Sequence, residues 1–360
     1  MNESPTPPAS LPPAPSAPTP APVPDSLPAS ALPPSSPPGN RSQEGVESGL
    51  WKEIHAEVKK VFVGQDEVLD QMLACLLAGG HVLLEGKPGL GKTHLVLALA
   101  KSFGGSFGRI QFTPDLMPSD VTGHTIYEMG SQSFHLRKGP VFANLLLADE
   151  INRAPAKTQA ALLEVMQETQ VTIDGESIRL EPPFMTIATQ NPIEQEGTYP
   201  LPEAQLDRFL MKVLIDYPDE SEEKWIVSAV ASGASGRGLT PQEVGTVASK
   251  EAILRAQEQV AAVQAVDEVV DYAVRIVRAT RGGSGIHLGA GTRGAIGLVR
   301  VAKAYAVMEG RNFIVPHDVK RAVLPVLRHR LTLSPELFMS GETVDQVLRS
   351  LVDAIDAPRG

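Results

Sequence analysis

The chain of 360 residues is long enough for two domains with cores of their own, and its hydrophobic content of 42% is ordinary for a globular protein. Its formal net charge of −10 argues against binding to nucleic acid through a broad basic face, although it leaves room for a local basic groove inside an oligomer. The sequence encodes neither a signal peptide nor an apolar run of about 18 residues that could span a membrane, so we expect a cytoplasmic protein.

The first part of the chain, residues 1–48, has the composition of a disordered arm. Residues 1–40 contain 15 of the 31 prolines, interleaved with alanine and serine. Proline donates no backbone hydrogen bond, and the segment offers few large apolar side chains to bury. We expect an extended arm that either acts as a solubilising spacer or docks onto a proline-binding partner, and no anchor residue decides between the two.

Residues 49–217 have the pattern of an α/β domain. The apolar spacing of WKEIHAEVKKVF predicts a helix that begins near Leu50, and THLVLALAKSF predicts another. Short continuous apolar runs alternate with such helices, which is typical of parallel strands covered on both faces. The clearest of these runs are HVLLEG at 81–86, NLLLADE at 144–150 and FMTIATQN at 184–191. The sequence therefore predicts a parallel sheet flanked by helices.

Two further patterns complete the expected layout. VTIDGESIRL, residues 171–180, alternates with a period of two around the turn dipeptide Asp174-Gly175, and it predicts a projecting β-hairpin. Residues 218–243 include the glycine-rich stretch GASGRGLTPQE and are expected to be a linker. Helical patterns follow, so residues 244–360 are expected to form a small all-α domain.

The stretch GKPGLGKT, Gly86 to Thr93, matches the phosphate-binding pattern G-x-x-x-x-G-K-[ST] and lies directly between a predicted strand and a predicted helix. Its glycines would let backbone N–H groups converge on phosphate oxygens, and the helix N-terminus adds the positive end of its dipole. Lys92 would neutralise the β- and γ-phosphates, and the Thr93 hydroxyl would ligate Mg²⁺. The loop predicts a nucleotide site, which alone does not distinguish a kinase, a GTPase and an ATPase.

Acidic side chains end the strand in LLLADE. Asp149 and Glu150 fall at its C-terminal end, where open α/β sheets bind ligands. We expect Asp149 to hold Mg²⁺ through its water shell and Glu150 to polarise an attacking water. Asn191, at the end of the next strand, is expected to hydrogen-bond the γ-phosphate or that water. Activation of water beside Mg²⁺ favours hydrolysis over transfer to a second substrate.

Together these residues resemble the MoxR family of AAA+ ATPases over roughly residues 50–335, most specifically in LLLADEINRAPAKTQAALLEVMQE, ATQNP and EAQLDRF. The resemblance implies ATP and Mg²⁺ as ligands, with GKPGLGKT as the Walker A loop, LLLADE as Walker B and Asn191 as sensor 1. It makes TGHTIYEMGSQSFHLRKGPVF look like the helix-2 insertion of this clade, and VTIDGESIRL like its hairpin before sensor 1. The nucleotide-binding residues that it implies are Gly64, Gln65, Gly86, Lys87, Pro88, Gly89, Leu90, Gly91, Lys92, Thr93 and His94.

The resemblance also assigns roles to arginines. It implies that Arg208, in LDRF, is an arginine finger for the ATP of a neighbouring subunit, and that Arg293, in GAGTRGAIG, is sensor 2. A finger requires another subunit's γ-phosphate nearby, so we expect a homo-oligomeric ring, a hexamer in the leading hypothesis. Gly-Thr precedes Arg293 where many members carry Ser-Pro, and Thr292 is expected to cap the helix instead. For Arg153 three roles stay open: orienting the Walker B turn, contacting the neighbour, or a structural salt bridge.

The leading hypothesis is a ring-forming Mg-ATP hydrolase that remodels or chaperones a protein partner, which the resemblance suggests is a protein with a von Willebrand factor A domain. The alternative is a nucleotide-switched binding or scaffold module in which slow hydrolysis only times release. A third class, nucleic-acid motors, is disfavoured because the two hairpin-like segments carry few basic residues, namely Arg137, Lys138 and Arg179. No nucleic-acid partner is therefore expected.

Overall fold

The structure is a computed structural model that describes residues 49–191, 197–232, 240–282 and 285–358. The proline-rich arm of residues 1–48, expected to be extended, lies outside the described residues, as does most of the glycine-rich stretch GASGRGLTPQE. Within the described part of the chain, no helix is both long and apolar enough to cross a membrane.

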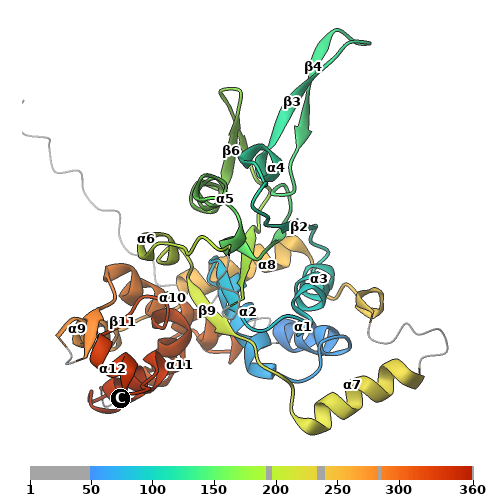
Figure 1. Ribbon diagram of the computed structural model, residues 1–360. Helices are drawn as coiled ribbons and strands as arrows, with labels where there is room; N and C mark the ends of the chain where they lie inside the picture. The colour runs from blue at the N-terminus through green and yellow to red at the C-terminus, as the bar shows by residue number, and fades with distance from the viewer. Residues whose placement is uncertain (1–48, 192–196, 233–239, 283–284, 359–360) are drawn as a thin grey trace, which may run out of the picture. The chain divides into compact units, whose positions relative to one another are not determined.

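A five-stranded parallel sheet forms the centre of the domain, as predicted (Figure 1). Its central strands are apolar on both faces, and successive residues of one strand face opposite layers: Leu145 and Leu147 belong to one hydrophobic cluster, Leu146 and Ala148 to the other. Because the strands run parallel, their carboxyl ends meet at one edge. In spatial order the strands are β2 (Phe107–Gln111), β5 (Leu145–Asp149), β8 (Met185–Gln190), β1 (Val82–Glu85) and β9 (Met211–Leu214).

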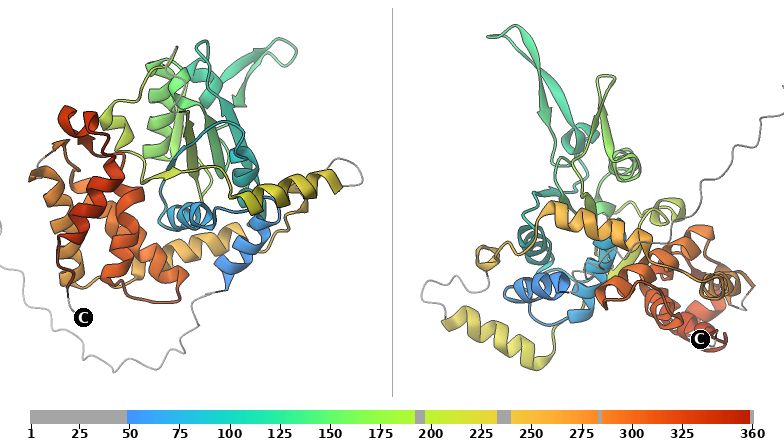
Figure 2. Two further views of the ribbon diagram at one scale, coloured as in Figure 1. Left: turned by 60° about the horizontal axis from the view of Figure 1, so that its bottom comes forward. Right: turned by 180° about the vertical axis from the view of Figure 1, so that it is seen from behind.

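Helices cover both faces of this sheet (Figure 2). One layer shares a hydrophobic cluster with Leu145 and Leu147, and it contains α1 (Leu50–Lys59), α2 (Asp66–Leu77) and α3 (Lys92–Ser102). The other layer packs against Leu146 through α5 (Ala156–Glu168), which follows the short helix η1 (Ile151–Arg153). The predicted arrangement of strand, helix and strand is therefore confirmed.

Two antiparallel hairpins project on the same side of the sheet (Figure 1). The hairpin predicted around Asp174-Gly175 is present, and both turn residues have positive φ angles, 51° and 85°. The segment that resembles the helix-2 insertion forms the second hairpin, and Thr125 from it donates a hydrogen bond to the Asp174 carboxylate. The elements are α4 (Pro118–Thr122), β3 (Gly123–Glu128), β4 (Ser133–Lys138), β6 (Gln170–Ile173) and β7 (Glu176–Arg179).

The C-terminal part is helical, as predicted, and it carries in addition a short antiparallel ribbon of two strands. The helices bury apolar faces that include Ile276, Leu298 and Val323. Its elements are α9 (Asp267–Gly282), β10 (Ile286–Leu288), α10 (Thr292–Met308), α11 (Pro316–Leu327), β11 (Thr332–Leu333), α12 (Pro335–Met339) and α13 (Val344–Asp353).

The region expected to be a linker, residues 218–243, contains regular structure. Helix α7 (Glu220–Ser232) and the short helix η2 (Pro241–Glu243) lie within it, downstream of α6 (Glu203–Leu206) and β9. The next helix, α8 (Lys250–Ala262), packs on α2 of the core, where the Gln257 side-chain amide donates to the Leu76 carbonyl at 2.7 Å. The same helix also contacts α10 of the helical domain, where the Lys303 ammonium donates to the Ala261 carbonyl at 3.1 Å. The segment that precedes α9 therefore packs against both the core and the helical domain.

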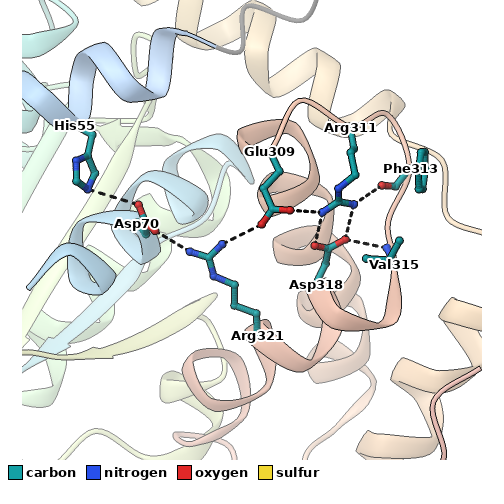
Figure 3. Close-up of polar contacts among 8 residues, drawn as sticks. All are labelled: His55, Asp70, Glu309, Arg311, Phe313, Val315, Asp318 and Arg321. Carbon is teal, nitrogen blue, oxygen red and sulfur yellow. Dashed lines mark hydrogen bonds and ion pairs between the residues drawn. The ribbon is translucent and has the colours of Figure 1, made fainter.

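Charged side chains join the helical domain to the core (Figure 3). The Arg321 guanidinium, on α11, donates to Asp70 on α2 at 2.7 Å and lies 3.5 Å from Glu309. Glu309 in turn accepts from Arg311 at 2.8 Å, and Arg311 makes two hydrogen bonds, of 2.7 and 2.9 Å, to the fully buried Asp318. This network seats the helical domain on α2, the helix that starts beside the predicted adenine position.

Candidate nucleotide-binding site

The predicted phosphate loop occupies the turn between β1 and α3. Strand β1 ends directly before Gly86, and α3 begins at Lys92. Gly89 and Gly91 have φ angles of 84° and 74°, a left-handed conformation that side chains disfavour. Gly86 is required for space instead, because a Cβ there would collide with Ile215, which follows β9. The glycines therefore permit a tight turn that brings the N-terminus of α3 to the sheet edge.

A cavity of 430 Å³ lies at this edge, and the predicted phosphate and metal residues line it together. The loop and α3 contribute Lys92 and Thr93, the end of β5 contributes Asp149 and Glu150, and Asn191 follows β8. Residues from three separate segments thus converge as the sequence suggested.

Lys92 is half-buried beside both acidic residues. Its ammonium donates to the Gly86 carbonyl within the loop. Burial lowers the pKa of Lys92, an effect that Asp149, Glu150 and Glu85 oppose through their negative charges. The loop therefore holds a desolvated cation at the place where an anionic ligand would gain most from it.

The two carboxylates of the Walker B segment have different partners. Asp149 accepts from the Thr189 hydroxyl at 2.6 Å through one oxygen and from Arg109 at 2.8 Å through the other. Glu150 accepts from the Gln111 amide at 2.9 Å, and Arg153 lies 3.3 Å from the same oxygen. The pair therefore contacts two separate sets of neighbours, and Arg153 forms the salt bridge that was one of its three possible roles.

Glu150 has a left-handed backbone, with φ 56°, which is uncommon for a residue with a side chain. Its N–H donates to the Thr189 hydroxyl at 2.9 Å, the same hydroxyl that donates to Asp149. One buried threonine therefore fixes both acidic residues, and the unusual backbone turns the second carboxylate away from the strand direction.

Sequence reasoning missed Arg109, Gln111 and Thr189, which contact the two carboxylates. Their positions follow from the strand order of the folded sheet: β2 pairs with β5 so that Gln111 lies opposite Asp149, and β8 pairs on the other side. Polar residues at the ends of these neighbouring strands had to meet Asp149 and Glu150. The sequence alone did not say which strands are neighbours.

A second cavity, of 390 Å³, adjoins the first and shares Gly89, Leu90, Gly91 and His94 with it. Gln65 lines it, as the resemblance implied for the adenine. Its opposite wall comes from Tyr217 and from α7, chiefly Ile226 and Val227. This wall was missed because residues 218–243 had been interpreted as a linker.

Some residues expected to contact nucleotide have structural roles here. Gly64 lines neither cavity; a Cβ on it would collide with the Glu222 carboxylate of α7, so it permits that close approach. Gly86 packs against Ile215, as described, and the Lys87 ammonium lies 4.5 Å from the centre of the Tyr217 ring. These residues shape the cleft from outside its two cavities.

Both predicted arginines lie outside the two cavities. Arg208 donates to the Leu163 carbonyl at 3.1 Å, and Arg293 lies 3.6 Å from the carboxylate of Asp207, the residue before Arg208 in the chain. The expected capping by Thr292 is wrong: α10 starts at Thr292, with Gly291 in the N-cap position and no side-chain cap. The structure therefore does not place either arginine in the cavity of Lys92.

The cavity fits a magnesium nucleotide. Thr93 and Asp149 supply the hydroxyl and carboxylate oxygens that Mg²⁺ prefers, and both line the same 430 Å³ space. Within the described residues no cluster of three His, Cys, Asp or Glu side chains could hold a metal without further ligands. The metal would therefore take most of its oxygens from phosphate and water, as Mg²⁺ does at phosphate loops.

Comparison with known proteins agrees with this geometry. Residues 81–211 match the family model "ATPase family associated with various cellular activities (AAA)", and residues 278–351 match the model of the AAA lid domain. The chain is 45% identical to the uncharacterized protein YeaC of Bacillus subtilis, an alignment that covers 88% of this chain and 97% of that protein. It is 43% identical to Chaperone MoxR1 of Mycobacterium tuberculosis, with 90% of this chain and 88% of the relative covered.

A solved structure supports the same assignment. The crystal structure of a putative ATPase from Cytophaga hutchinsonii superposes with a TM-score of 0.80 at 41% sequence identity, covering 87% of this chain and 96% of the other. The helical domain is accordingly an AAA lid, and the phosphate loop and the acidic pair lie within the residues that match the AAA ATPase model. The chain belongs to the MoxR family of AAA+ ATPases.

Proposed function

We propose that the protein hydrolyses Mg-ATP in this cleft and uses the cycle, as a homo-oligomeric ring, to remodel or chaperone a protein partner. The observation that carries the hydrolytic part is the convergence of Lys92, Thr93, Asp149, Glu150 and Asn191 on one cavity. A hydrolase needs a cation for the phosphates, a place for the metal and a carboxylate for the water, and these residues supply each of them.

Each residue has one role in this proposal. Lys92 neutralises the β- and γ-phosphates, and Thr93 with Asp149 holds the metal, which when bound polarises the phosphoryl group. Glu150 orients and polarises the attacking water, and Asn191 donates a hydrogen bond to the γ-phosphate or that water. The apolar wall of α7 encloses the adenine beside Gln65.

The ring is supported by the position of Arg208 and Arg293. Both lie outside the two cavities of their own subunit, and the Arg293 side chain is 56% exposed. We propose that both serve the ATP of a neighbouring subunit, which requires a head-to-tail interface that closes into a ring, a hexamer in the simplest case.

The two hairpins support a protein client. The longer one exposes Met129, Phe134 and Tyr127, and exposed apolar patches of this kind mark protein interaction sites. The relative MoxR1 of Mycobacterium tuberculosis is named as a chaperone. A protein with a von Willebrand factor A domain is the first client to test, on the strength of the family resemblance.

The decisive variant is Glu150→Gln. It keeps the size of the side chain and its hydrogen bond with Gln111 but removes the charge that polarises water, so we expect ATP to bind normally and turnover to fall at least roughly a hundredfold. Steady-state phosphate release and equilibrium binding of ATP measure the two effects. Glu168→Gln, an exposed position at the end of α5, is the matched control and should behave as wild type. Near-normal turnover in Glu150→Gln would contradict the proposal.

A slowly hydrolysing nucleotide switch is the alternative, favoured by the engagement of Glu150 with Gln111 and Arg153. Turnover measured against protein concentration separates the two functions. A ring that uses Arg208 across subunits gains specific activity as it assembles, whereas a switch that acts as a monomer shows constant specific activity.

A further inference from the structure

Arg109 is the one strongly basic side chain of β2 that lines the phosphate cavity, and the roles proposed above leave it without a function. Its guanidinium donates to Asp149 Oδ2 at 2.8 Å and to the Gln111 side-chain oxygen at 3.2 Å. Arg109 thus contacts the same carboxylate that is proposed to hold the metal.

The two donors to Asp149 differ in how firmly they are placed. Thr189 is only 1% exposed and also accepts the Glu150 N–H, so its hydrogen bond to Asp149 is part of the buried frame. The Arg109 side chain is 48% exposed and lies on a strand at the edge of the sheet. If a cation is to reach Asp149, Arg109 is therefore the partner that can leave.

Charge repulsion from a metal ion would move the Arg109 guanidinium away from Asp149. A metal at Asp149 would bring two positive charges next to the guanidinium and would compete for the same oxygen. Phosphate oxygens in the same cavity offer Arg109 a new acceptor, and the flat guanidinium can donate two hydrogen bonds to a phosphate.

We propose that Arg109 is a nucleotide-binding residue that exchanges partners: it pairs with Asp149, and it transfers to the polyphosphate of ATP when Mg²⁺ takes Asp149. This inference rests on the proposed function. Arg109 acts within its own subunit, in contrast to Arg208 and Arg293, and it makes ATP binding and metal binding at this site support each other.

The test uses the full chain and two binding measurements that do not depend on turnover. A fluorescent ATP analogue is titrated in excess EDTA and, in separate samples without EDTA, in saturating Mg²⁺. In Arg109→Gln we expect affinity in Mg²⁺ to fall about tenfold, because a charge-assisted contact to phosphate is lost. Affinity in EDTA should change by no more than about twofold, because Arg109 then remains paired with Asp149.

Two further variants make these shifts specific. Arg278→Gln removes the same charge at an exposed position on α9, outside both cavities, so both measurements should stay within about twofold of wild type. Arg109→Lys keeps the charge and should retain most of the affinity in Mg²⁺. Arg109→Ala serves as a second neutral variant if Arg109→Gln unfolds.

The measurements separate a failure of the proposed exchange by Arg109 from a failure of the proposed function. Unchanged affinity in Mg²⁺ for Arg109→Gln, an equal loss in EDTA, or equal shifts in Arg278→Gln, overturns the exchange while leaving the hydrolase intact. Failure of the wild-type protein to bind the ATP analogue at all instead overturns the proposed function itself.

Discussion

The two halves of the nucleotide cleft are built in different ways. The phosphate half consists of a loop and strand ends inside the parallel sheet, where Thr189 and the glycines leave little freedom. The base half is closed by α7, a helix near the surface whose Trp225 and Val227 side chains are 50% and 63% exposed. The phosphate half is therefore embedded in the core, whereas the wall of the base half depends on a partly exposed helix.

We expect the largest loss of ATP affinity from a substitution in the phosphate half. Replacing Lys92 by Ala removes the half-buried cation that faces the phosphates, so we expect ATP affinity to fall by at least about a hundredfold. Calorimetric titration with ATP measures it. Lys87→Ala is the matched control in the same loop; its ammonium faces Tyr217, and only a small change is expected. Equal losses in the two variants would mean that the phosphate half is not organised around Lys92.

Low pH should lower the free energy of unfolding through His81, the residue directly before β1 in the phosphate half. The largely buried His81 ring accepts from the Thr186 N–H at 3.0 Å and donates to the Met166 carbonyl at 2.9 Å; burial lowers its pKa from 6.5 to about 4. Below pH 6.5 the unfolded chain binds a proton at this ring while the folded protein does not. The free energy of unfolding therefore decreases between pH 6.5 and 4, by about 3 kcal/mol, and levels off below that range.

Denaturant unfolding at several pH values measures this loss. Buried His329, whose pKa is also well below 6.5, adds in the same direction, so the diagnostic quantity is the difference between wild type and His81→Gln. The variant should lose the part of the pH dependence that His81 contributes, about 3 kcal/mol between pH 6.5 and 4. His287→Gln, an exposed position on β10, should keep all of it. A pH dependence unchanged by His81→Gln would remove this residue from the account of acid stability.

We expect the smallest loss of ATP affinity from a substitution in the base half. Ile226→Asp places a charge in the wall of the base cavity, and we expect ATP affinity to fall about tenfold while turnover at saturating ATP is nearly unchanged. Binding and steady-state kinetics together check it. Ala231→Asp introduces the same charge at an exposed position on the same helix, outside the cavity wall, and this control should bind ATP normally. A loss of turnover without a loss of affinity in Ile226→Asp would show that α7 contributes to hydrolysis and not to binding of the base.

The same division explains what could be predicted from the sequence. Gly86 to Thr93, Asp149 and Asn191 were found because each motif is local and sits at the end of an apolar strand. Arg109 and Thr189 were missed because their importance depends on which strands are neighbours, a property of the folded sheet.

The α7 wall of the base half was missed for another reason. Helix α7 has its apolar side chains partly exposed, so its pattern resembles a connecting segment until Tyr217 and Ile226 are seen beside Gln65. The pairing of Arg293 with Asp207, next to Arg208, likewise joins residues that are far apart in the chain. The motif of sensor 2 predicted an arginine at the start of a helix but not the surface on which that helix begins.

The contact between Gly86 and Ile215 has a consequence for which substitutions the cleft would tolerate. The close approach at Gly86 forbids a side chain at that point of the loop, whereas α7, which starts shortly after Ile215, is partly exposed. Under the proposed function, substitutions in α7 would change the affinity for the base and leave the phosphate loop in place. A side chain at Gly86 would instead displace the loop or the residue that follows β9.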